Sequence, residues 1–187
     1  NQLKIRTEDV SFVIDELKIM FEKDKRFSQV ADFDNIGIFG HSFGGCTSIM
    51  SAYNDTRIDA VIGLDAYFLP LPKEIIKKDL NTPFVHLGQV SWGDSDNYEV
   101  MSELGKSSNR EFYHFAIEGS KHNDYTDFSQ FTKLTRKFGS GKISPKSIRY
   151  IMNDVMLGFF DYHLKNRSIF DHNQYRKKYE SVKTYVY

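Results

Sequence analysis

Residues 35–50 read NIGIFGHSFGGCTSIM, and this stretch joins an apolar run to a helical pattern through a glycine-rich turn. Its first part, residues 35–39, predicts a short buried strand, and the apolar positions after Ser42 recur at helical spacing. Gly40 and Gly44 flank the serine in the pattern G-x-S-x-G, and we expect both to remove side chains that would collide where strand and helix close up. This strand–turn–helix context predicts that Ser42 is exposed at a sharp turn, where its hydroxyl can act as a nucleophile near the helix amides.

Composition narrows the class of protein. The 187 residues suit a single domain over 1–187, and the hydrophobic share of 40% is enough for a core. The 25 basic and 25 acidic residues balance, so we expect no nucleic-acid partner. A single cysteine excludes an internal disulfide and a multi-cysteine zinc site. No apolar run approaches the roughly 18 to 20 residues of a membrane span, and the first ten residues are too polar for a secretory signal.

The rest of the chain alternates between helix and strand patterns. Thr7 is a candidate N-cap for an amphipathic helix over about 8–23. Short apolar runs predict buried strands at 35–39, 58–65, 83–89 and 111–119. Ser144 followed by Pro145 predicts the start of a long helix that ends near 165. This rhythm predicts an α/β protein with a mostly parallel sheet covered by helices.

A serine nucleophile needs a base and a carboxylate that orients the base, here in the order serine, acid, histidine. We expect His122 to be the base, because it lies in a loop directly after the last predicted strand. The other downstream histidines lie within strands or in and beyond the last helix: His86, His114, His163 and His172. The residues leave the acid open between Asp65, which ends a strand beside the serine strand, and the later pair Asp94 and Asp96.

Three segments in this order and spacing resemble the platelet-activating-factor acetylhydrolases, the lipoprotein-associated phospholipase group of α/β-hydrolases. They are IGIFGHSFGG at 36–45, IGLDAYFLPL at 62–71 and GSKHNDYTDF at 119–128. The resemblance implies the α/β-hydrolase fold, with Ser42 as nucleophile, Asp65 as triad acid and His122 as base. It further implies that the Phe43 N–H is one oxyanion donor and that Tyr67 and Phe68 line an acyl pocket. The plasma form of the family has Trp where this chain has Tyr67.

An α/β-hydrolase normally supplies a second oxyanion donor from a loop well before the serine, after several strands. Here 34 residues precede the strand at 35, and their pattern predicts one helix. We therefore expect that strand to lie at a sheet edge. We also expect the chain to be the C-terminal part of a larger hydrolase, or a hydrolase that has lost its N-terminal half, and to require that half.

Four other features carry weaker signals. The segment 129–142 interleaves apolar and basic residues, which suits either lipid-surface contact or, by preference, a helix that covers the sheet. His122 with its neighbouring acids is a poor metal site, and we expect no metal. Cys46 is expected to pack in the core, and residues 176–183 are expected to form a solvated tail.

Together these features predict a serine esterase that acts without calcium or any cofactor on phospholipids with a short or oxidised acyl chain. One alternative is a general carboxylesterase, similar to dienelactone hydrolases, that acts on small soluble esters. Another is a non-catalytic binding module with a hydrolase fold.

Overall fold

The computed structural model describes residues 2–24, 26–92, 96–167 and 169–187. Its strands are β1 (Ile36–His41), β2 (Ile58–Leu64), β3 (Phe84–Gln89), β4 (Phe112–Ile117) and β5 (Val182–Val186). Its α-helices are α1 (Gln2–Lys23), α2 (Phe43–Asn54), α3 (Lys73–Ile76), α4 (Asp96–Lys106), α5 (Phe128–Phe131), α6 (Pro145–Lys165) and α7 (His172–Lys178). Two 3₁₀ helices are η1 (His122–Tyr125) and η2 (Lys133–Phe138).

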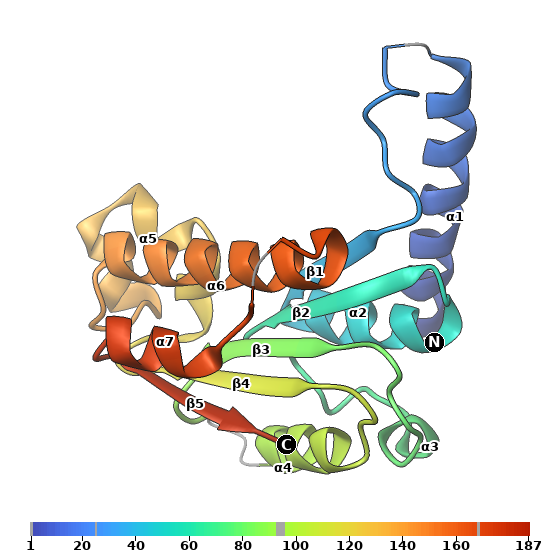
Figure 1. Cartoon of the computed structure of the whole chain (residues 1–187). Coiled ribbons are helices and arrows are strands. Elements are labelled where there is room, and N and C mark those ends of the chain that lie inside the picture. Colours follow the sequence, from blue (N-terminus) through green and yellow to red (C-terminus); the bar gives the residue numbers. More distant parts are fainter. Residues whose placement is uncertain (1, 25, 93–95, 168) are drawn as a thin grey trace.

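The strands form one sheet in the order β1-β2-β3-β4-β5, parallel except for the antiparallel β4–β5 pair. Side chains alternate between its faces, as the period of a strand requires. Val61 packs into the cluster beneath α1, α2 and α4, whereas Ile62 packs into the cluster beneath α6 and α7. Helices thus cover both faces of a mostly parallel sheet, as predicted (Figure 1).

The strand that leads to the serine lies at the edge of this sheet, since β1 pairs with β2 and with no other strand in the described part of the chain. Phe39 on this strand is 57% exposed. Helix α1 packs on α2 through Leu3 and Thr7 and then projects beyond the sheet (Figure 1). In the described part of the chain, the edge of the sheet at β1 therefore exposes an apolar side chain and has no neighbouring strand.

The prediction for the first helix needs correction. The helix begins at Gln2, and Thr7 lies inside it, where its hydroxyl donates to the carbonyl of Leu3 at 2.8 Å instead of capping the helix. Of its predicted apolar stripe, Val13 and Leu17 face solvent because the helix leaves the body of the domain. A threonine followed by acidic residues resembles an N-cap, but back-bonding to the preceding turn uses the same side chain.

Two predictions for the C-terminal third also need correction. Residues 176–183 are mostly exposed to solvent, as expected, but they are not a tail, because they end α7 and begin β5, where Val182 is buried. The segment 129–142 does not form one covering helix. It contains most of α5 and all of η2, and Phe131, Leu134 and Phe138 on it are exposed.

The long helix α6 begins as predicted. Ser144 is its N-cap, with its hydroxyl accepting from the Ser147 amide, and Pro145 occupies the first position. Cys46 is fully buried in the core, as expected, and burial raises the pKa of its thiol to about 12. Within the described ranges, none of the helices combines the length and the hydrophobicity that crossing a bilayer requires.

Candidate active site

Ser42 occupies the turn between β1 and α2 with φ 56°, a backbone conformation that is uncommon for residues other than glycine. Hydrogen bonds hold it there. Its amide donates to the Leu64 carbonyl at 3.0 Å, and its carbonyl accepts from the amides of Gly45 and Tyr67, each at 3.0 Å. The surrounding structure therefore stabilises a strained backbone that places the serine at the head of the helix.

The glycines around Ser42 serve different purposes. A Cβ at Gly40 would lie 2.4 Å from backbone atoms of Gly44, so that position requires glycine for the turn to close. A Cβ at Gly44 would meet nothing within 4 Å, which contradicts the expected collision there. The tight contact belongs to Gly45 instead, where a Cβ would lie 2.6 Å from the Cβ of Ala66. Gly45 thus allows α2 to approach the loop after β2.

His122 reaches Ser42 from the turn after β4. Its Nε2 lies 3.0 Å from the Ser42 Oγ, and its Nδ1 lies 2.7 Å from Oδ2 of Asp65. A carboxylate only accepts, so the neutral imidazole donates from Nδ1 and offers Nε2 as the acceptor for the serine hydroxyl. The Asp124 carboxylate holds this turn by accepting from the Lys121 and Gly141 amides at 2.8 and 2.6 Å.

Asp65 follows β2 and is fully buried, with φ 43°. Besides His122, its carboxylate accepts from the Gln89 amide (3.0 Å), the Gln89 side chain (2.9 Å) and the indole Nε1 of Trp92 (3.1 Å). The acid that meets the histidine is therefore Asp65. Asp96 belongs to the first turn of α4, and Asp94 lies outside the described residues.

Gln89 and Trp92 were not predicted as partners of the acid. Gln89 ends β3, Trp92 follows in the next loop, and β3 pairs with β2, the strand that precedes Asp65. Because the carboxyl ends of parallel strands meet at one edge of a sheet, donors in this loop could have been anticipated. The Trp92 ring also packs edge-on against His122 and stacks on Tyr67, with centroid distances of 5.0 and 5.8 Å.

His41, the residue before the serine, was missed as well. Its Nε2 lies 3.0 Å from the His122 carbonyl, and the two rings are 4.4 Å apart. Burial, with a smaller contribution from His122, lowers the pKa of His41. Its neutral ring can donate from Nε2 to that carbonyl and so fix the backbone of the base.

The polar side chains of His86 and Asn97 hold the loop after Asp65 in place. The Ala66 amide donates to Nε2 of the buried His86 at 3.1 Å, and the Phe68 amide donates to the Asn97 side chain at 2.6 Å. Phe68 is itself fully buried and packs in the core, so its predicted role in an acyl pocket is wrong. In a loop, sequence does not show which of two adjacent aromatics faces inward. Tyr67 is partly exposed beside Trp92 and stays a candidate for that pocket.

The Phe43 N–H is the first of α2 and precedes any acceptor within the helix, which suits the predicted oxyanion donor. No group of three metal-binding side chains occurs in the parts of the chain that the structure describes. The two carboxylates near His122 in the chain already accept hydrogen bonds from other protein groups. Asp124 accepts from backbone amides, and Asp127 accepts from the Gln130 side chain at 3.3 Å.

Comparison with known proteins agrees with the fold. A solved ferulic acid esterase from Streptomyces cinnamoneus superposes with a TM-score of 0.72 at 24% identity, covering 89% of this chain and 50% of the other. This similarity identifies the architecture as that of the α/β-hydrolases.

Among curated proteins, the platelet-activating factor acetylhydrolase of Gallus gallus is 29% identical over 143 residues, which cover 75% of this chain and 34% of the relative. That of Canis lupus familiaris is 28% identical over 166 residues, which cover 87% and 35%. The chain thus spans about a third of the length of the curated relatives it matches. Residues 6–185 match the family described as platelet-activating factor acetylhydrolase, isoform II. The chain therefore belongs to the platelet-activating factor acetylhydrolase, isoform II, family.

Proposed function

We propose that the protein is a serine esterase that works through an acyl-enzyme. The observation that carries this proposal is the continuous line of hydrogen-bond contacts from Ser42 through His122 to Asp65. In the first half-reaction Oγ of Ser42 attacks the ester carbonyl carbon while Nε2 of His122 takes its proton. Asp65 stays ionised and holds the Nδ1–H, and the Phe43 N–H donates to the developing oxyanion.

Collapse of this tetrahedral intermediate breaks the ester C–O bond, and His122 returns the proton to the leaving alcohol. Water then attacks the acyl-serine with His122 again as base, which releases the carboxylic acid and restores Ser42. Every proton moves through residues of this chain, so the proposed chemistry requires neither a cofactor nor calcium.

For the substrate, we propose a phospholipid with a short or oxidised acyl chain. The relatives from chicken and dog are named as acetylhydrolases of platelet-activating factor, which supports this class. Exposed apolar side chains on α5 and η2 support contact with a lipid surface: Phe131, Leu134 and Phe138. Arg136 and Lys137 lie between them in sequence and would favour anionic headgroups. Tyr67 and Trp92, beside His122, are the candidates for acyl contact.

A small soluble ester is the second candidate, favoured by the ferulic acid esterase among the structural neighbours. Comparing turnover of a short-acyl phosphatidylcholine with turnover of p-nitrophenyl acetate distinguishes the two candidates. We expect a higher kcat/KM for the phospholipid, and a loss on the order of 10⁶ for both substrates in Ser42→Ala. A preference for the soluble ester would favour the second candidate, and undiminished turnover by Ser42→Ala would reject the esterase mechanism.

We also propose that strands outside this chain pair with β1 and that a loop among them supplies the second oxyanion donor. The exposed Phe39 and the unpaired side of β1 support this arrangement. One missing donor typically costs about 10² to 10³ in rate. The 187-residue chain alone should therefore turn over that much more slowly than a longer protein that contains it. Equal rates would mean that the second donor comes from within this chain.

A further inference from the structure

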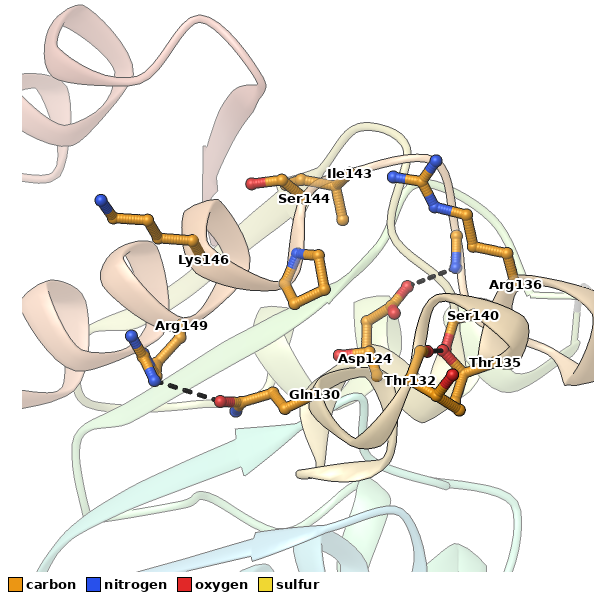
Figure 2. Close-up of a pocket in the computed structure, with 13 residues that line it drawn as sticks. Asp124, Gln130, Thr132, Thr135, Arg136, Ser140, Ile143, Ser144, Lys146 and Arg149 are labelled. Carbon is orange, nitrogen blue, oxygen red and sulfur yellow. Dashed lines mark hydrogen bonds between the residues drawn. The ribbon is translucent and has the colours of Figure 1, made fainter.

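A pocket lies behind the turn that carries His122. It has a volume of about 760 Å³, and its walls come from η1, from the α5–η2 segment and from the first turns of α6 (Figure 2). Neither Ser42 nor Asp65 lines it. The pocket is therefore distinct from the space in which the ester would react.

The charge on the walls of this pocket is mainly positive. Arg136, Lys146 and Arg149 line it, and none of the three forms an ion pair with a carboxylate in the described part of the chain. Arg149 donates to the Gln130 side chain at 3.1 Å, which orients its guanidinium at the wall (Figure 2). The acid of the pocket, Asp124, already accepts two backbone amides. Three cationic residues and one carboxylate thus line the pocket.

Buried hydroxyl groups on the same walls lack partners. Ser129 and Ser140 are each more than nine-tenths buried, and neither Oγ has a hydrogen-bond partner among the described residues. A buried hydroxyl without a partner is costly, and such groups call for an explanation. An oxyanion bound in the pocket would give both hydroxyls an acceptor after a rotation about χ1.

The start of α6 adds a further donor. The amides of Ser147 and Ile148 already bond to Ser144, and Pro145 has no N–H, which leaves the Lys146 amide as the remaining donor of the first turn. The N-terminus of a 21-residue helix also favours negative charge. The helix N-terminus, the cationic side chains and the two hydroxyls therefore all favour an anionic ligand that accepts hydrogen bonds.

We propose that this pocket binds a phosphate group, either as free phosphate or as part of a phosphate ester. The pocket is far larger than one phosphoryl group, so it leaves room for the substituent of the ester. Arg136, Lys146 and Arg149 supply charge-assisted hydrogen bonds, and Ser129 and Ser140 supply neutral ones. The group can come from free phosphate or from a lipid headgroup. Binding requires no turnover, so the proposal stands or falls independently of the esterase mechanism.

The test is isothermal titration calorimetry of the purified protein with two probes, inorganic phosphate and glycerophosphocholine. Saturable binding of either probe supports the site, and the probe that binds more tightly identifies the source. Arg149→Gln should weaken that binding about tenfold or more, since it removes charged hydrogen bonds. Lys177→Gln, on α7 and outside the pocket, removes the same charge and should leave the affinity unchanged.

Ser140→Ala keeps the test decisive if the arginine variant fails to fold. Because its hydroxyl has no partner, we expect this variant to melt no earlier than the parent without ligand and yet to bind the probe several-fold more weakly. The proposal is overturned if neither probe binds, or if Arg149→Gln and Lys177→Gln weaken binding equally. It is also overturned if the folded Ser140→Ala variant binds as the parent does.

Discussion

The indole Nε1 of Trp92 donates to Oδ1 of Asp65 at 3.1 Å, while the other oxygen of that carboxylate faces His122. One side chain therefore orients the acid and also packs against the base, since the indole ring lies edge-on to the imidazole. A loop outside the family-like motifs thus helps to set the geometry of Asp65 and His122.

Trp92→Phe should lower kcat about tenfold, because it removes a hydrogen bond to a charged group but keeps a ring against His122. KM should change little if the indole acts through the acid. Steady-state kinetics with a soluble ester would measure both constants. A variant with the kcat of the parent would show that the N–H is dispensable.

Asp65→Asn should cost around 10⁴ in turnover, because an amide cannot hold the imidazole in the required tautomer. Asp96→Asn is the matched control and should change turnover by less than about tenfold, since Asp96 lies in α4 and not at His122. We expect the same of Asp94→Asn. If the ranking were reversed in folded variants, the acid would belong to the later loop.

Gly44 and Gly45 are adjacent, and substituting each by alanine compares an open position with a tightly packed one at the turn that carries Ser42. Gly45→Ala should destabilise the protein by about 1 to 3 kcal/mol, because its Cβ would overlap that of Ala66. Gly44→Ala has open space and lies in a helix, where alanine gains roughly 0.5 to 1 kcal/mol over glycine. Urea unfolding of both variants would measure these changes. Equal destabilisation would contradict the observed close approach.

Because His86 and His114 are buried, we expect the protein to lose stability in acid. Burial lowers the pKa of His114 to about 4 and that of His86 well below its usual 6.5. Between pH 6.5 and about 4 the unfolded chain therefore binds more protons than the folded one, and the free energy of unfolding falls as the pH falls. Each histidine contributes up to about 1.4 kcal/mol per pH unit in that window. His114→Phe should flatten the curve by about one such contribution, and a slope equal to that of the parent would contradict this account.

Local patterns in the sequence predict most of the fold. Each of the four parallel strands lies within about two residues of its expected range, because a buried strand and its flanking turns are local features. Strand β5 escaped prediction, since its five residues depend on pairing with β4, about 70 residues earlier in the chain. Such a contact leaves no local signal.

In the candidate site, too, local motifs predict some residues, and residues whose position depends on tertiary packing were missed. Ser42 and His122 follow from motif and chain order, and the family resemblance adds Asp65. Trp92 was missed because the direction of its indole is set by tertiary packing. Phe68 was misassigned for the same reason, as the adjacent Tyr67 faces the site while Phe68 enters the core.

Intact mass spectrometry after treatment with a fluorophosphonate would show whether Ser42 is the covalent nucleophile. Cys46 should not compete, because burial raises the pKa of its thiol to about 12 and keeps it protonated. We predict one adduct per chain, located on the peptide that contains Ser42, no adduct in Ser42→Ala and greatly slowed labelling in His122→Ala. Labelling of Ser42→Ala at the rate of the parent, or an adduct on any other residue, would show that Ser42 is not the nucleophile.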